Sequence, residues 1–164
     1  MRIHLISLTL ITAVTAWAQA SGSGPTKTYS SADEVQALIA KAIAEHKEGQ
    51  ATVVERILEL APYRANLEYR TSVGPAAIHE KDAELFFVID GAATLTTGGE
   101  LIDGKHTNAD NIFGTGIKGG TSQHLAKGDF VIVPENTPHW FSAIDGRISL
   151  LTLHVPRGAT GNTH

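Results

Sequence analysis

From Ala51 onward, short apolar runs alternate with turn-forming residues along most of the chain. Proline, glycine, asparagine or an Asp-Gly pair separates runs of strand length: ATVVERILEL, RANLEYRTSV, ELFFVI, AATLTTGG, DFVIVP, HWFSAI and RISLLTLHV. Many short strands at regular spacing predict an all-β sandwich or antiparallel barrel over residues 51–156. Residues 98–120 break this pattern because they are polar and glycine-rich, and we expect a long loop there.

Residues 31–49 carry the period of a helix instead. Ser31 is followed three positions later by Glu34, which is the sequence of a capping box at a helix start. Apolar residues then recur every three or four positions, at Val35, Leu38, Ile39, Ala42 and Ile43. Gly49 provides a suitable C-terminal stop. We therefore expect one N-terminal amphipathic helix, packed against the outside of the β-structure.

The N-terminus has the layout of a secretory signal peptide. Residues 1–20 combine Arg2, about a dozen apolar residues and an Ala-Gln-Ala sequence suited to cleavage after Ala20. The alternative is a membrane anchor, but this apolar stretch is shorter than the roughly 20 residues that a spanning helix needs. We expect a periplasmic or secreted protein with no membrane contact after cleavage. A flexible Gly/Ser/Pro-rich leader over residues 21–30 and a C-terminal tail over residues 157–164 complete the predicted organisation.

Composition narrows the range of partners and of chemistry. At 164 residues with 42% hydrophobic content, the chain is long enough for one domain with a substantial core. Its net charge of −4 and the lack of a basic run argue against nucleic acid as a partner. The sequence has no cysteine, so no disulfide supports the fold and no thiol acts as nucleophile or metal ligand. A metal site in this chain must use His, Asp and Glu.

A histidine and a carboxylate stand directly before the apolar run that ends at Ile89. His79 and Glu84 are five positions apart, so on one unbroken strand they would project to opposite faces. The intervening sequence Glu-Lys-Asp-Ala is suited to a turn, after which Glu84 would share a face with Phe86. A buried carboxylate is costly unless it is paired or bound to a metal. Either Glu84 has a partner inside the barrel, or it is a solvated charge at the rim beside Lys81 and Asp82.

Two segments resemble the two sequence motifs of the cupin superfamily, and each occurs once and in the family's order. The residues that carry the resemblance are His79, Glu84 and Gly91 in the first segment and Gly128, Pro134, Asn136 and His139 in the second. The resemblance extends over residues 51–156. It implies a small antiparallel β-barrel of the cupin or jelly-roll type, whose mouth often holds a divalent metal, and it implies a homodimer.

The resemblance is incomplete at one metal-ligand position. Ala77 stands where the first cupin motif has its leading histidine. Carried over residue by residue, the resemblance implies His79, Glu84 and His139 as metal ligands. Two histidines and one carboxylate are the ligand set of many non-haem iron sites, and Fe, Mn, Zn, Ni and Cu all remain open.

Other residues have a functional and a structural interpretation. His124 is a candidate for the missing ligand, although an exposed histidine is the commoner case, and His154 on the last strand is expected to be a core or edge residue. Tyr69 and Arg70 are candidates to reach the barrel interior and bind an anionic substrate, with cross-strand packing as the alternative. Phe141 is a candidate to line the substrate pocket, with a place in the core as the alternative.

Three kinds of function are consistent with these features. In the first, a metal in the barrel mouth acts on a small molecule, as in an oxygenase, isomerase or lyase. In the second, the barrel binds a small molecule without chemistry. In the third, the motifs are structural and the domain is a scaffold. No feature of the sequence selects a substrate or decides whether the protein is an enzyme.

Overall fold

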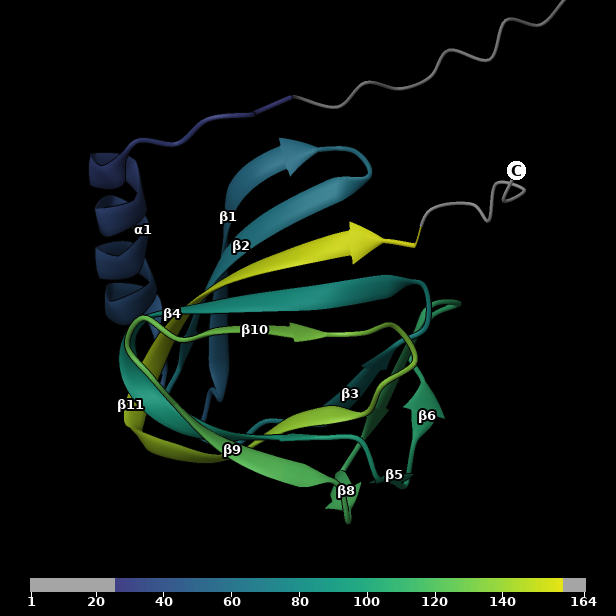
Figure 1. Cartoon of the computed structure of the whole chain (residues 1–164). Helices are drawn as coiled ribbons and strands as arrows, with labels where there is room; N and C mark the ends of the chain where they lie inside the picture. The colour runs from purple at the N-terminus through teal and green to yellow at the C-terminus, as the bar shows by residue number, and fades with distance from the viewer. Residues whose placement is uncertain (1–25, 158–164) are drawn as a thin grey trace, which may run out of the picture.

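A computed structural model describes residues 26–157 as one helix and eleven strands (Figure 1). The elements are α1 (Ala32–Glu45), β1 (Thr52–Leu60), β2 (Tyr63–Arg70), β3 (Ala76–His79), β4 (Asp82–Thr97), β5 (Glu100–Ile102), β6 (Lys105–His106), β7 (Asn111–Gly114), β8 (Gly116–Lys118), β9 (Thr121–Ala126), β10 (Phe130–Val133) and β11 (His139–Pro156). The predicted signal peptide, half of the leader and most of the tail lie outside the described residues. Within residues 26–157, no helix has the length and apolar character to cross a membrane.

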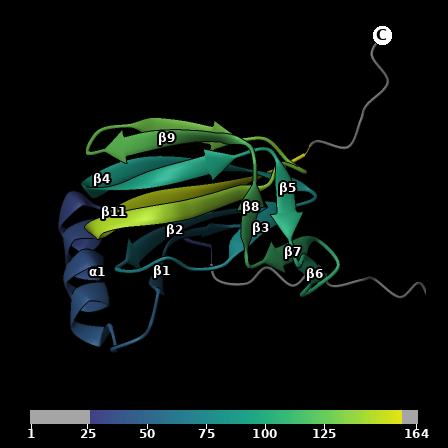
Figure 2. The same ribbon diagram turned by 90° about the horizontal axis from the view of Figure 1, so that it is seen from below.

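Two antiparallel sheets face each other and share the two longest strands, β4 and β11. The first sheet has the order β10, β4, β11, β2, β1 and uses the first half of β4 and the second half of β11. The second sheet adds β9 to the other half of β4, and β3, β7 and β6 to the start of β11 (Figure 2). Strands β5 and β8 form a separate two-stranded sheet. The predicted all-β antiparallel architecture with one helix is confirmed.

The shared strands bend where they pass from one sheet to the other. Gly91 of β4 has φ +83°, and a Cβ there would lie 2.1 Å from the backbone oxygen of Arg147. Opposite this point the register of β11 shifts between Ile144 and Ile148, as a bulge requires. Only glycine tolerates both the left-handed backbone and the close approach of β11, so Gly91 allows the sheets to fold over one another.

Alternation along β4 builds the core between the sheets. Glu84, Phe86 and Val88 are buried on the inner face, whereas Phe87 is exposed on the outer face, as the sequence pattern predicts. The core is completed by apolar side chains of both sheets, namely Ala93, Leu95, Leu125, Val133, Phe141, Ile148 and Leu150. Because Glu84 shares the inner face with these side chains, it must find polar partners inside the barrel.

The helix has the predicted start but ends earlier than predicted. Ser31 and Glu34 form the capping box in both directions. The helix ends at Glu45 rather than near Gly49, because the backbone of His46 is extended and its Nε2 lies 2.8 Å from both Gln50 O and Thr71 Oγ1. The helix covers part of the outer face of the first sheet, where Ala42 is fully buried.

Two predicted irregular segments are more ordered than expected. Residues 98–120, predicted as a long loop, contain β5 to β8. Their glycines permit neighbouring segments to approach closely: a Cβ at Gly114 of β7 would lie 2.3 Å from the backbone oxygen of Ile102 of β5. Within the predicted flexible leader, Lys27 exchanges backbone hydrogen bonds of 2.8 and 2.9 Å with Glu59 of β1. Composition alone did not reveal these backbone partners.

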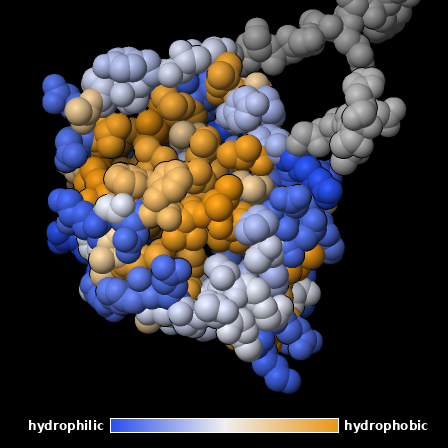
Figure 3. Space-filling view, viewed as in Figure 1, coloured by the Kyte–Doolittle hydropathy of each residue, from blue (hydrophilic) through white to orange (hydrophobic). Residues whose placement is uncertain are grey.

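The outer face of the first sheet carries apolar side chains beyond the helix. Phe130 is 65% exposed and Ile132 is 59% exposed on β10, and Phe87 of β4 is 38% exposed. Figure 3 shows apolar residues gathered at the centre of this view, with hydrophilic residues around them. We name Phe87, Phe130 and Ile132 the outer apolar face.

Candidate metal centre

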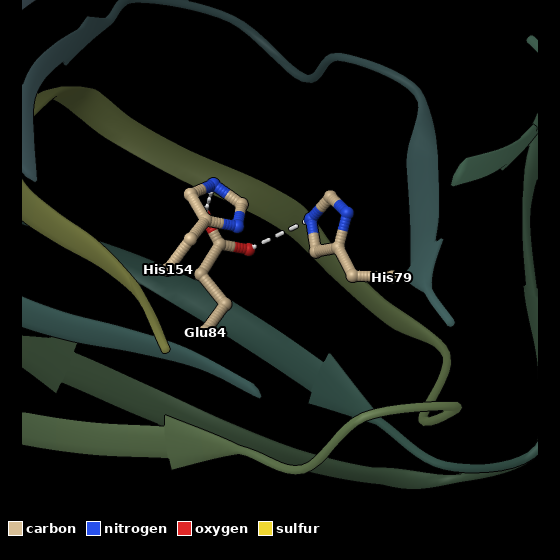
Figure 4. Close-up of side chains that lie close together, drawn as sticks. All are labelled: His79, Glu84 and His154. Atoms are coloured by element: carbon tan, nitrogen blue, oxygen red, sulfur yellow. Dashed lines mark hydrogen bonds and ion pairs between the residues drawn. The ribbon is translucent and has the colours of Figure 1, made fainter. Parts of the chain in front are cut away.

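Three histidines surround one buried carboxylate at an end of the barrel. Oε2 of Glu84 lies 3.1 Å from Nε2 of His79 and 3.0 Å from Nε2 of His139. Its other oxygen, Oε1, lies 3.5 Å from Nε2 of His154. Figure 4 shows His79, Glu84 and His154 pointing toward one another. Ligand atoms of these three residues all lie within 4.8 Å of one another, close enough to bind one metal ion together.

The strand order explains this convergence. β3 ends at His79 and β4 begins at Asp82, so a short break lets His79 turn toward Glu84. Strand β11 contributes the other two histidines. In the strand register, His139 lies opposite Ala77 of β3 and His154 lies opposite Glu84 of β4. The two histidines of β11 are separated in sequence, and both reach Glu84 because β11 bends between the two sheets.

Hydrogen bonds on the far side of two rings determine which nitrogen faces Glu84. Asn111 donates from Nδ2 to Asn108, so its Oδ1 accepts a hydrogen bond from Nδ1–H of His79. The Nδ1–H of His139 donates to the backbone oxygen of Thr137 at 3.1 Å. In the neutral rings, both Nε2 atoms therefore carry a lone pair. Two lone pairs and a carboxylate oxygen about 3 Å apart repel unless a proton or a metal cation lies among them.

The charges in the cluster shift the ionisation of its members in different directions. Burial alone raises the pKa of Glu84, but hydrogen bonds from His139 and His79 overcome it and hold this pKa far below its ordinary value. Burial lowers the pKa of His79, while the hydrogen bond and charge of Glu84 oppose it and leave the pKa raised. Burial lowers the pKa of His154 despite the charge of Glu84. An ionised Glu84 beside a neutral His154 is the protonation state that metal binding requires.

The structure brings together the three predicted ligands and adds one that the sequence interpretation missed. His154 was expected to be a core or edge residue, but its side chain, only 15% exposed, faces Glu84. Its place on the inward face, in alternation with the buried Leu150 and Thr152, was a signal that could have identified it. His124 does not replace the missing ligand, because its side chain is 59% exposed and bonds to Asp145.

A cavity of about 350 Å³ adjoins the cluster and includes two of the three predicted substrate-binding residues. Arg70 and Phe141 line it. Tyr69 does not, because neighbouring residues of a strand point to opposite faces, and Tyr69 packs on the helix side of the first sheet. The prediction that Tyr69 and Arg70 both reach the barrel interior was therefore wrong for Tyr69. Glu68, which the sequence interpretation did not consider, lines the cavity beside Arg70.

The domain consists of two facing antiparallel sheets that share their longest strands, and a cluster of histidines and a carboxylate lies inside one end. These features are the basis for comparison with known proteins. No protein-family model and no curated protein sequence matches the chain. Among solved structures, a cupin superfamily protein of Desulfitobacterium hafniense DCB-2 matches with a TM-score of 0.50 and 15% identity, over 69% of this chain and 84% of that chain. The Fe(II) form of HppE matches with a TM-score of 0.50 and 16% identity, over 68% of this chain and 54% of that chain. The chain therefore has the cupin-type jelly-roll fold that the sequence resemblance implied.

Proposed function

We propose that this protein is a metal-dependent cupin that acts on a small molecule in the cavity beside the cluster. His79, Glu84 and His154, whose ligand atoms all lie within 4.8 Å of one another, would hold one divalent metal ion, with His139 as a further ligand through the Nε2 that lies 3.0 Å from Glu84. The observation that carries the proposal is the contact of Glu84 with three Nε2 atoms, at 3.0, 3.1 and 3.5 Å. Two of these nitrogens present lone pairs because their rings donate from Nδ1 elsewhere.

The donor set suits a first-row transition metal. Three imidazole nitrogens and one carboxylate oxygen fit Fe, Mn, Zn, Ni or Cu better than Mg or Ca, which prefer oxygen ligands. HppE, one of the proteins with this fold, is described with Fe(II), so iron is the first metal to test. A bound metal would polarise an oxygen atom of the substrate as a Lewis acid.

The residues behind the cluster would keep the ligands in position. Asn111 holds the ring of His79, and the backbone oxygen of Thr137 holds the ring of His139. Such outer contacts orient ligands and maintain their tautomers. Phe86 lies beside His139, with ring centroids 6.1 Å apart, and closes the cluster against the core. This preorganisation favours a metal-binding role over a purely structural role for the two motifs.

Elemental analysis of untagged protein tests the proposal directly. After reconstitution with Fe, Mn, Zn, Ni and Cu in turn, we expect one equivalent of at least one metal per chain. Glu84→Gln should weaken binding because it keeps an oxygen ligand but removes the charge, and His124→Ala should bind like the wild type. If no metal binds the wild type, the proposal is wrong and a ligand-binding or scaffold role takes its place. A substrate screen with the loaded protein then separates an enzyme from a non-catalytic binding module.

We also propose that the protein is exported and that residues 1–20 are removed. The proposal is supported by the charged start, the short apolar stretch and the Ala-Gln-Ala sequence. Mass spectrometry of the periplasmic or secreted fraction should find a chain that begins at Ser21, or within two or three residues of it. An intact Met1 terminus in the membrane fraction would contradict export with cleavage.

We further propose that the outer apolar face binds a second copy of the chain. Its three side chains expose roughly 300 Å² if each large side chain presents about 200 Å² when fully exposed. This is somewhat less than half of the ~800 Å² per partner of a standard interface, and the hydrophilic residues around the outer apolar face would form the polar rim that interfaces usually have. Light scattering should give twice the monomer mass. Phe130→Asp should give a monomer, whereas Ile102→Asp, an exposed control on β5, should not. A monomeric wild type at high concentration would refute the dimer.

A further inference from the structure

A second pair of charged groups lines the cavity, apart from the metal cluster. Glu68 and Arg70 lie on the inner face of β2, and their side chains are only 10% and 17% exposed. The Nε and Nη2 groups of Arg70 both donate to one oxygen of Glu68, Oε2, at 2.9 and 2.6 Å. The guanidinium carbon also lies 4.7 Å from the centroid of the Phe141 ring. Arg70 is therefore held in place on two sides.

This pairing determines which ligand charge the cavity accepts at this end. The carboxylate of Glu68 compensates the charge of Arg70, so the pair is neutral overall. A carboxylate of a ligand that approached Arg70 would also approach Glu68, and bringing like charges together in a site shielded from water is costly. The sequence-based hypothesis that Arg70 binds an anionic substrate is therefore not supported by its surroundings.

The pair nevertheless retains hydrogen-bonding capacity on both of its members. Among the described residues, no partner bonds to Oε1 of Glu68 or to Nη1 of Arg70. The first atom accepts hydrogen bonds and the second donates them. A hydroxyl group can donate to Glu68 and accept from Arg70 at the same time, whereas a carboxylate only accepts. The unused atoms of the pair match an alcohol.

Apart from the metal cluster and Thr52, the rest of the cavity wall is apolar. Val54, Phe113, Trp140 and Phe141 line it, and the indole N–H of Trp140 already donates to the backbone oxygen of Gly74 at 2.9 Å. A volume of about 350 Å³ lies near the lower end of the range for small-molecule sites. These walls suit a small ligand that combines a hydroxyl group with an apolar or aromatic part.

We propose that the cavity binds small neutral alcohols, with a hydroxyl group between Glu68 and Arg70 and an apolar part against the aromatic wall. The inference deepens the proposed function by naming its substrate class. It rests on that function only for the chemistry at the metal cluster, and not for the binding of the alcohol. Because Glu68 does not contact the metal cluster, its role can be measured with or without metal.

The test compares benzyl alcohol with benzoate, two probes that share an aromatic ring and differ in the polar group. Binding is measured by ligand-observed NMR titration on EDTA-treated protein, so that benzoate cannot coordinate a metal. We expect the wild type to bind benzyl alcohol at least about tenfold more tightly than benzoate, because benzoate meets the charge of Glu68. Equal or tighter binding of benzoate would overturn the inference, and this comparison requires no variant.

Glu68→Gln provides a sharper test in the same assay. The substitution leaves the charge of Arg70 uncompensated, so the preference should reverse toward benzoate. Glu100→Gln, at an exposed position on β5, should keep the preference of the wild type. A folded Glu68→Gln protein that still prefers the alcohol would refute the role of Glu68. Metal content is measured separately: absence of metal from the wild type would refute the proposed function and leave this preference as it is.

Discussion

Replacing His154 by alanine tests the most specific feature of the proposed centre. The sequence resemblance to the cupin motifs implies His79, Glu84 and His139 as ligands, and neither motif includes residue 154. In the structure, Nε2 of His154 lies 3.5 Å from Oε1 of Glu84. If His154 is a fourth ligand, His154→Ala should weaken metal binding. If the three motif residues are sufficient, the substitution should have little effect on it.

The size of the effect follows from the number of ligands. Loss of an outer-shell contact typically costs 10- to 100-fold in metal affinity, so loss of one direct ligand of four should cost at least ~100-fold. A 100-fold change corresponds to about 2.7 kcal/mol of binding free energy. At saturating metal, the same amount is lost from the stabilisation of the folded state. For a domain of this size, the Tm of the loaded protein should fall by about 5–10 °C.

Calorimetric titration and thermal unfolding at a fixed free metal concentration measure both quantities. His124→Ala is the matched control, because this histidine is exposed and bonds to Asp145 away from the cluster. The Tm of each variant without metal is subtracted, so that the lost packing of His154 does not count as lost metal binding. Wild-type affinity and a wild-type metal-induced Tm shift in His154→Ala would refute the four-ligand centre.

Three further predictions follow from the same geometry. In the metal-free protein, the raised pKa of His79 means that its contribution to stability is complete below its ordinary pKa of about 6.5 and is lost as pH rises through the raised value. Urea unfolding of the metal-free protein should therefore show that the free energy of unfolding decreases above neutral pH. Metal in place of the proton should abolish this decrease. Asn111→Ala, which frees the Nδ1–H of His79, should lower metal affinity by about 10- to 100-fold in the same titration, and an unchanged affinity would exclude a positioning role. Gly91→Ala should destabilise the fold by more than the ~1–2 kcal/mol cost of a left-handed alanine, because its Cβ would lie 2.1 Å from a backbone oxygen. Gly146→Ala is the control, since Gly146 has φ +74° with no atom within 4 Å of the added Cβ and should incur only the backbone cost. Equal losses of unfolding free energy in chemical denaturation would contradict the clash at Gly91.

Local patterns in the sequence were sufficient for the elements and for part of the site. The capping box at Ser31 marked the start of the helix because both of its partners lie within four residues. The alternation in β4 placed Glu84 on the inner face, since strand geometry has a period of two. The same rule excludes a common direction for Tyr69 and Arg70, so that error was avoidable from the sequence. His79, Glu84 and His139 came from motif spacing, and the structure brings their side chains together.

Tertiary structure alone determined the rest of the cluster. His139 and His154 lie on one strand, and a straight strand would place residues fifteen apart at a separation of roughly 50 Å. Both nevertheless contact Glu84, because β11 bends between the sheets at the bulge opposite Gly91. The extent of that bend depends on packing between strands that are distant in sequence. No local pattern records it, so the position of His154 beside Glu84 became evident only in the folded chain.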